Sequence, residues 1–257
     1  MSEVISLNIW QFALIYLLLL VVLAIMKKCK INQTKLLIVA SMRMTAQLVL
    51  AGLILTYIFE NPHPAFTSAY ILLMTSFAIH MALQRNKTIN KKFKWIVGLS
   101  LALSGIAIVC FFIMAIIGVS IFNPQYTIPI SGMIIGNAMT GVSLGIKAFN
   151  ESIHAQRARI DALINMGVTP QKILTPFVNG AIETALLPTL NSMLGMGIIS
   201  LPGMMTGQIL SGTLPMTAIL YQIAIVIAIT TVTCLSVFCA LFFGSRTLYN
   251  KRSQIMI

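Results

Sequence analysis

The sequence has few charged residues, and this shortage excludes a water-soluble globular fold. Only 9% of the 257 residues are charged and only five are acidic, whereas 58% are hydrophobic. A soluble domain is about 25% charged, because its surface has to face water. We therefore expect an integral membrane protein that has the lipid bilayer as a partner, with residues 1–257 forming one polytopic membrane domain.

Motifs for several chemistries are also absent from the sequence. The four cysteines include no C-x-x-C pair and the three histidines include no H-x-x-x-H pair. No G-x-x-x-x-G-K-[ST] segment occurs, which is the loop that cradles nucleotide phosphates. No carboxylate dyad or Ser–His arrangement suggests an enzyme. We expect no catalytic residues and no cofactor bound by this chain, and the residues of a metal site stay unknown.

The apolar runs predict the fold class. Seven runs of about 20 residues, the length that spans a bilayer, are separated by polar connections. We predict an all-α integral membrane protein with about seven transmembrane helices. The approximate limits of the runs are Leu7–Met26, Leu36–Phe59, Ala65–Leu83, Ile96–Val119, Ile128–Ile146, Phe177–Leu201 and Met216–Phe243.

The basic residues, which give a net charge of +12, lie in every second connection. Sixteen of the 17 lie in the first, third and fifth connections and the C-terminal tail, and Arg43 lies within the second run. Cytoplasmic loops are enriched in Lys and Arg because translocating positive charge is disfavoured. We predict an external N-terminus and a cytoplasmic C-terminus. The protein is expected to be a multi-pass protein of the cell (inner or plasma) membrane, without a nucleic-acid partner.

The fifth connection, about residues 147–175, is polar and predicts a cytoplasmic helix-turn-helix. Ile153, Ile160 and Ile164 fall at i, i+7 and i+11, which is the spacing of one face of an amphipathic helix. Arg157 interrupts that apolar stripe. The segment is either a docking element for a cytoplasmic partner, a helix on the lipid surface, an extension of a spanning helix or a plain connector.

The residues after this helix predict a sharp turn. Gly167 can end the helix in the left-handed conformation that glycine tolerates. The hydroxyl of Thr169 can cap the next helix, and Pro170 suits its first position because the missing N–H has no partner there.

Four segments resemble one transporter family in their order and spacing. They are Gly132–Ala138 (GMIIGNA), Leu163–Pro170 (LINMGVTP), Ala185–Pro188 (ALLP) and Ser200–Gly207 (SLPGMMTG). They are similar to the FetB-like (YbbM-like) family of ABC-transporter permeases for iron export, which has plant relatives linked to aluminium tolerance. The resemblance covers about Leu36–Tyr249.

The resemblance implies a permease subunit that works with a separate cytoplasmic ATP-binding subunit, which would bind ATP and Mg. It also implies a homodimer and the export of a metal ion, for which iron is the first candidate. Asp161-Ala162-Leu163-x-x-x-Gly167 looks like the first half of the EAA loop, the coupling helix of ABC permeases, although the second half does not follow. We expect Arg157 and Asp161 to contact the ATPase, and Gly167, Thr169 and Pro170 to set the turn.

Polar and methionine residues in the fifth and sixth runs are candidates for the substrate path. An ionisable residue in lipid is costly and commonly faces an interior or a cavity, which selects Glu183. Methionine thioethers favour soft ions such as Cu(I), but methionine is also flexible core filler. The polar groups can equally hydrogen-bond to neighbouring helices. The candidates are Asn137, Thr140, Glu183, Asn191, Ser192, Met193 and Met196.

Two further features concern how the helices pack. Gly132 with Gly136, and Gly141 with Gly145, form two G-x-x-x-G pairs, which indicate either packing within the subunit or a homodimer seam. We also hypothesise that Arg43 pairs with Glu183. The alternative is that the arginine snorkels and the glutamate reaches interfacial water.

The segment of residues 201–215 has two prolines and three glycines but no charge. Irregular backbone near the membrane needs protein or a watery cavity around it. We predict an external hairpin or re-entrant segment that acts as a gate. Its gate residues are Pro202, Gly203, Met204, Met205 and Gly207.

Other functions stay open at the level of sequence. One alternative is an ABC permease for an organic solute such as a nucleotide sugar, because Asn, Ser and Thr suit many solutes. Another is an ATP-independent channel or secondary transporter, with Glu183 as its titrating group. A third is an accessory scaffold that binds a partner and moves no solute.

Overall fold

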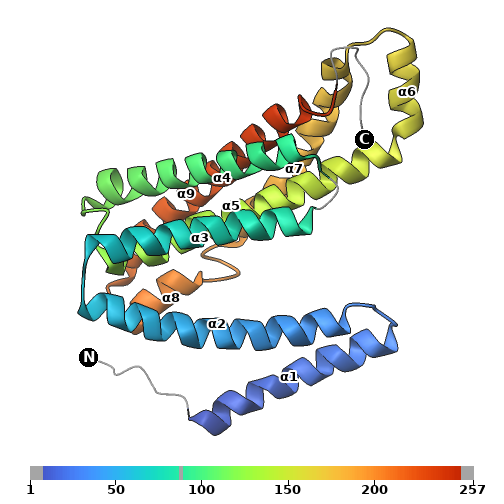
Figure 1. The fold of residues 1–257 in the computed structure, drawn as a ribbon. Coiled ribbons are helices and arrows are strands. Elements are labelled where there is room, and N and C mark those ends of the chain that lie inside the picture. Colours follow the sequence, from blue (N-terminus) through green and yellow to red (C-terminus); the bar gives the residue numbers. More distant parts are fainter. Residues whose placement is uncertain (1–7, 87–88, 250–257) are drawn as a thin grey trace. The chain divides into compact units, whose positions relative to one another are not determined.

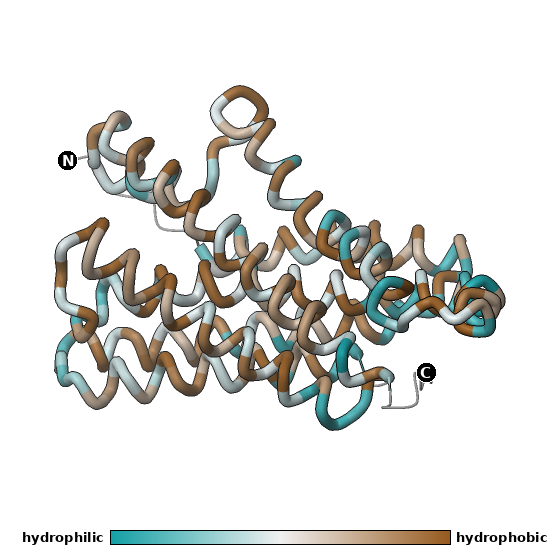
Figure 2. The backbone as a smooth tube through the Cα atoms, turned by 90° about the horizontal axis from the view of Figure 1, so that it is seen from above, coloured by the Kyte–Doolittle hydropathy of each residue, from teal (hydrophilic) through white to brown (hydrophobic). Residues whose placement is uncertain are grey.

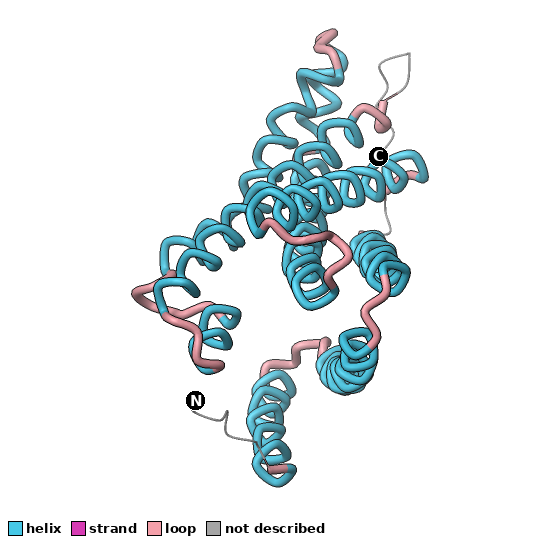
Figure 3. Tube along the Cα trace, turned by 90° about the vertical axis from the view of Figure 1, so that its left-hand side faces the viewer, coloured by secondary structure: helices cyan, strands magenta, loops and turns pink. Residues whose placement is uncertain are grey.

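The structure is a computed structural model that describes residues 8–86 and 89–249, and every regular element in those ranges is a helix (Figures 1 and 3). Seven helical segments are long and apolar enough to span a membrane, which confirms the predicted number of spans. The elements are α1 (Ile9–Lys28), α2 (Thr34–Glu60), α3 (Pro64–Arg85), α4 (Lys91–Phe111), the π-helix η1 (Phe112–Ile117), α5 (Pro124–Ala155), α6 (Arg157–Asn165), α7 (Pro170–Gly195), α8 (Gly203–Leu210) and α9 (Pro215–Ser245).

The chain divides into two compact units. The first comprises the chain up to Asn61 together with Leu210–Thr213, and the second comprises Pro62–Ile209 and the chain from Leu214. In the first unit, α1 contacts α2, and the hydroxyl groups of Tyr16 and Thr45 lie 2.5 Å apart across that contact. The second unit holds all the cavities described below.

Helix α5 lies at the centre of the second unit, because it packs against α3, α4, α7 and α9. Its side chains Ile134, Ile146 and Phe149 are fully buried. Between α4 and α9, the hydroxyl groups of Ser104 and Ser236 lie 2.5 Å apart in the core. Close packing and such interhelical hydrogen bonds are what hold helices together in lipid, where apolar burial gives no driving force.

Two glycines of α5 allow α9 to approach closely. A Cβ atom on Gly141 would lie 2.4 Å from Thr233 Cγ2, and one on Gly145 would lie 3.0 Å from Val237 Cγ1. Gly136 has no neighbour within 4 Å of the corresponding position. The second G-x-x-x-G pair therefore serves packing within the chain, so it gives no support to a homodimer seam.

Hydrogen bonds bring the basic connections of the second unit to one end. Asn90 Nδ2 donates to the Thr247 carbonyl at 3.1 Å, which joins the start of α4 to the end of α9. Asn86 Nδ2 donates to the Ser143 carbonyl at 3.4 Å, which ties the end of α3 to α5. Figure 2 shows that hydrophilic residues gather towards the end of this unit that carries α6.

The fifth span extends further than its apolar run. Helix α5 has 32 residues and continues to Ala155, whereas the apolar run ends at Ile146. At 1.5 Å per residue it is about 48 Å long, and the hydrocarbon core of a bilayer is about 30 Å thick. Its last turns therefore project beyond the apolar layer.

The prediction of a single amphipathic helix through Ile153, Ile160 and Ile164 is wrong. The backbone leaves the helix at Gln156, where φ is −112° and ψ is 25°, and α6 begins at the next residue. Ile153 therefore belongs to α5, and Ile160 to α6. Both isoleucines reach the core, where each is only 1% exposed, although they lie on either side of the break.

We predict that Gly141→Ala destabilises the protein and that Gly136→Ala does not. The added methyl group at Gly141 collides with Thr233 on α9, and overpacking of this kind costs about 1–3 kcal/mol. The matched change at Gly136 meets open space on the same helix. Thermal unfolding of both variants in the same detergent measures the difference, and equal midpoints would contradict the close α5–α9 contact.

Candidate functional site

The turn between α6 and α7 is a Schellman motif. Gly167 has φ of +83°, its N–H donates to the Ile164 carbonyl at 2.9 Å, and the Val168 N–H donates to the Leu163 carbonyl at 3.1 Å. These two bonds satisfy carbonyls that the helix end leaves without partners. Glycine is favoured at this position because a Cβ atom strains the left-handed backbone. The helix-turn-helix has therefore formed as predicted, and its role in coupling stays a prediction.

The start of α7 departs from the prediction in one detail. Thr169 is the N-cap residue with extended backbone and Pro170 is the first helical residue, but the Thr169 hydroxyl makes no capping hydrogen bond. The residue is exposed, so solvent can satisfy both the hydroxyl and the free N–H groups of the first turn.

The two predicted partner contacts of α6 pair with each other. Arg157 Nε lies 3.6 Å from Asp161 Oδ2, and the two side chains are 45% and 57% exposed. An exposed pair one turn apart on a helix stabilises it by only about 0.3–0.5 kcal/mol. Both groups can therefore exchange this bond for one to a binding partner at little cost.

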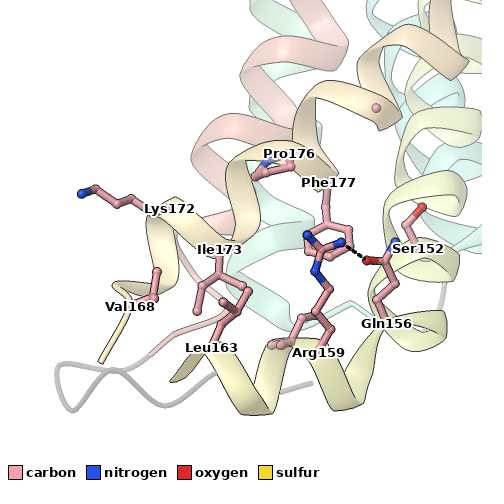
Figure 4. Close-up of a pocket in the computed structure, with 11 residues that line it drawn as sticks. Ser152, Gln156, Arg159, Leu163, Val168, Lys172, Ile173, Pro176 and Phe177 are labelled. Carbon is pink, nitrogen blue, oxygen red and sulfur yellow. Dashed lines mark hydrogen bonds between the residues drawn. The ribbon is translucent and has the colours of Figure 1, made fainter. Parts of the chain in front are cut away.

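A cavity of about 330 Å³, the hairpin cavity, lies between α6, the end of α5 and the start of α7. Arg159 Nη1 donates to Gln156 Oε1 at 3.1 Å, and both residues line the cavity (Figure 4). Leu163, Val168 and Ile173 form its apolar wall. An apolar side chain of a docking partner would fit such a cavity.

A second cavity of about 270 Å³, the central cavity, lies among α5, α7 and α9. It brings together four of the seven predicted path residues: Asn137 and Thr140 from α5, Ser192 from α7 and Met196, which directly follows α7. The other lining residues are Gly141, Leu144, Ala185, Pro188, Thr189, Gln222, Val226 and Ile229.

The polar side chains of α5 in the central cavity donate hydrogen bonds to carbonyl groups of their own helix. Thr140 Oγ1 donates to the Gly136 carbonyl at 3.0 Å, and Asn137 Nδ2 donates to the Met133 carbonyl at 2.8 Å. A hydroxyl has a single proton, so the Thr140 oxygen has only lone pairs left to offer the cavity.

A third cavity of about 550 Å³, the methionine cavity, adjoins the central one, because Met196, Gln222 and Val226 line both. Met193 and Met205 also line it, and Thr230 Oγ1 lies 3.3 Å from Met193 Sδ. The rest of its wall is mostly aliphatic, from α9 and the loop after α7.

The predicted gate segment contains the short helix α8, which begins at Gly203 and carries Met204 and Gly207. Eight residues span about 12 Å, so α8 is too short to cross a membrane. Pro202 and Met205 line the methionine cavity, and Met205 is buried. Half of the segment is thus regular rather than an irregular hairpin.

The remaining path candidates lie apart from these cavities. Glu183 and Asn191 are exposed on α7 and line neither the central nor the methionine cavity. Arg43 belongs to α2 of the first unit and Glu183 to the second, so their pairing stays a prediction. Within residues 8–86 and 89–249, no three His, Cys, Asp or Glu side chains gather as a metal site.

Sequence reasoning missed Gln222. It is only 9% exposed, it lines both cavities, and its Oε1 atom has no hydrogen-bond partner. The sequence could have revealed Gln222 because it is the only amide side chain in the long apolar helix α9. A polar residue within a membrane span commonly faces an interior or a cavity.

Comparison with known sequences decides the family. The family model described as "Uncharacterised protein family (UPF0014)" matches residues 9–249. The chain belongs to the UPF0014 family. UPF0014 membrane protein YjkA of Bacillus subtilis is 33% identical over 216 residues, which cover 84% of this chain and 85% of that protein.

Two other relatives have more informative names. Probable iron export permease protein FetB of Escherichia coli is 32% identical over 252 residues, covering 97% of this chain and 96% of that protein. Protein ALUMINUM SENSITIVE 3 of Arabidopsis thaliana is 33% identical over 213 residues, covering 83% of this chain and 76% of that protein. No solved structure matches the chain. The chain is therefore a multi-pass membrane protein of a family with a probable permease among its members.

We predict that cysteines placed in the central cavity react with a water-soluble thiol reagent. In a background without the four native cysteines, Thr140→Cys and Ser192→Cys should react at least about tenfold faster than Leu187→Cys, because thiolate needs water to form. Leu187 is the control because it is exposed on α7 outside both cavities. Equal labelling rates in lipid nanodiscs would show that the cavity is not a watery path.

Proposed function

We propose that this chain is the permease subunit of an ABC transporter that exports a metal ion, with energy from a separate ATPase. Iron is the first candidate for the exported ion. The observation that carries the proposal is the end-to-end similarity to a probable iron export permease, over 97% of this chain. A central cavity lined by helices that span the membrane agrees with a transport path.

The proposed orientation puts the α6 end of the second unit in the cytoplasm of a cell-membrane protein. Basic loops favour the cytoplasmic side, and the basic connection before α4 shares one end of the unit with the end of α9. Helix α6 would then dock on the ATPase, with Arg157 and Asp161 making polar contacts. ATP and Mg would bind to that partner.

The way α6 is attached suggests how docking is transmitted. It directly follows α5 and precedes α7, and these two helices supply Asn137, Thr140 and Ser192 to the central cavity. We propose a homodimer of single-domain permeases with two ATPases. Closure of the ATPases moves α6, which moves α5 and α7, so the central cavity alternates between the two sides and α8 gates its outer side.

The alternatives gain less support from the cavities. A nucleotide sugar carries phosphates, and no Lys or Arg lines the central or the methionine cavity. Coupling to an ion gradient through Glu183 has no support there either, because that side chain lines neither cavity. An organic solute without phosphate remains the alternative cargo that this neutral, polar lining suits.

The test is ATP hydrolysis by the reconstituted complex. The chain is co-purified in lipid nanodiscs with candidate ATPases from its own genome, and hydrolysis is measured against Fe²⁺, other metal ions and organic solutes. We expect a stable complex that Fe²⁺ stimulates. Stimulation by an organic solute alone would show that the cargo is an organic solute and not a metal ion. The absence of any ATPase partner would overturn the ABC assignment.

We predict that Gly167→Val uncouples transport while Gly167→Asn largely preserves it. Valine at φ of +83° costs about 1–2 kcal/mol, which is enough to open the turn, whereas asparagine tolerates this backbone. Export from vesicles and ATPase binding are measured for both variants at matched membrane insertion. Normal export by the valine variant would remove the coupling role of this turn.

A further inference from the structure

A small cavity of about 100 Å³, the α7–α9 groove, lies where α7 begins and α9 ends. Helix α7 lines it with polar side chains, whereas α9 contributes aromatic rings and the arginine that directly follows the helix. The residues that matter for binding are Gln171, Thr175, Asn179, Phe238, Phe242 and Arg246.

Arg246 is held on an aromatic stack. The rings of Phe238 and Phe242 are stacked with centroids 5.2 Å apart, and Arg246 Cζ lies 4.5 Å from the centroid of Phe242. A cation over a ring interacts through the flat face of the guanidinium group. The N–H donors lie in the guanidinium plane, so they stay available for a planar, bidentate contact with an oxyanion such as phosphate.

The charge of Arg246 is not balanced by an acid in the groove. No carboxylate of the described residues lies within salt-bridge distance of Arg246, and neither Asp nor Glu lines the groove. Glu183 is one turn beyond Asn179 on α7 and lies outside the lining. An anionic ligand would therefore meet a net positive charge.

The polar side of the groove offers further donors. Gln171, Thr175 and Asn179 follow one another at intervals of four residues, so they share one face of α7. The Thr175 hydroxyl donates to the Gln171 carbonyl at 2.7 Å. The side-chain amides of Gln171 and Asn179 make no hydrogen bond within the described residues, and each has two N–H donors to offer. This face suits a ligand that is rich in acceptor oxygens.

The aromatic side of the groove continues as an apolar face of α9. Leu235, Phe238 and Phe242 fall at i, i+3 and i+7, which places them on the same face, and the first two are 41% and 42% exposed. The groove itself has room for only about three waters at about 30 Å³ each, so it can hold a phosphate group but no hydrocarbon chain. A chain attached to that phosphate would lie along the exposed face.

The position of the groove along the span matches the lipid headgroups. Helix α9 is long and apolar enough to cross a membrane, and Arg246 is the first residue after it. Asn90 at the start of α4 is joined to Thr247, so the groove lies at the end of the unit that carries basic connections. Basic pockets between helices at this depth attract anionic lipid headgroups.

We propose that the α7–α9 groove binds an anionic phospholipid. The headgroup phosphate accepts hydrogen bonds from the Arg246 guanidinium and from the amides of Gln171 and Asn179. An acyl chain lies against Phe238 and Leu235. This site is separate from the central cavity, and it holds whatever the cargo of the permease is.

The first experiment measures lipid binding directly. The full-length permease in detergent is titrated with phosphatidylglycerol or with phosphatidylcholine of the same acyl chains, and native mass spectrometry counts the lipids bound. We expect one phosphatidylglycerol to bind at least about tenfold more tightly than phosphatidylcholine, because the choline group of the latter meets Arg246. Equal affinities would overturn the proposal.

Variants tie the binding to the groove. Arg246→Gln and Asn179→Leu should each weaken phosphatidylglycerol binding about tenfold, the effect of losing one hydrogen bond to a charged group. The matched controls are Arg85→Gln and Gln84→Leu, which remove the same groups from exposed positions at the end of α3, outside the groove. An arginine that only anchors the protein at the membrane surface responds to overall charge, so equal losses in Arg246→Gln and Arg85→Gln would contradict a built site. Thermal unfolding midpoints establish that each variant is folded.

Two further measurements separate a lipid from a soluble phosphate and locate the site. Glycerol 3-phosphate in large molar excess should not displace the bound lipid, because it lacks the chain that contacts α9. Displacement would assign the groove to a soluble phosphate compound instead. A photoactivatable phosphatidylglycerol should cross-link to peptides of α7 and α9 in lipid nanodiscs, and cross-links confined to other helices would overturn the proposal. None of these measurements uses the ATPase, so their outcome is independent of the proposed transport function.

Discussion

The close approach of α5 to α9 is the contact on which the rest of the second unit depends. It requires glycine at Gly141 and Gly145, because a single methyl group at the first would collide with Thr233. Gly141 also lines the central cavity, so the contact that holds the two helices together forms part of its wall. Asn137 and Thr140, which precede Gly141 on α5, line the same cavity. Packing and the candidate path are thus one structural feature.

The same helix links the two candidate sites. Helix α5 runs from the central cavity to beyond the apolar layer, and α6 begins directly after its end. Ile153 on α5 and Ile160 on α6 are both buried, so the hairpin is held to the bundle by apolar side chains rather than by its exposed ion pair. A rigid attachment of this kind is what transmission of a push on α6 requires, whereas a flexible linker would absorb it.

The sequence predicted the seven spans and the turn at Gly167 because both depend on local properties, namely apolar length and the backbone freedom of glycine. It placed Asn137, Thr140, Ser192 and Met196 on a path, and the structure brings these four to one cavity. It failed where tertiary packing matters: the helix breaks at Gln156, and Ile153 and Ile160 on either side of the break both pack into the core. Gln222 was missed since one amide in an apolar run has no periodicity to reveal it.

The neutral lining also bears on what a transport site needs. A cluster of carboxylates would hold a divalent cation tightly, and a cargo that is held tightly leaves slowly. Hydrogen bonds between a cargo and the neutral hydroxyl and amide groups of Asn137, Thr140 and Ser192 are individually weak, and each is replaced by water when the cavity opens. Binding of this kind is set by the geometry of the cavity, so a movement of α5 against α7 changes several of these bonds at once. The energy for release can then come from the helices that line the cavity.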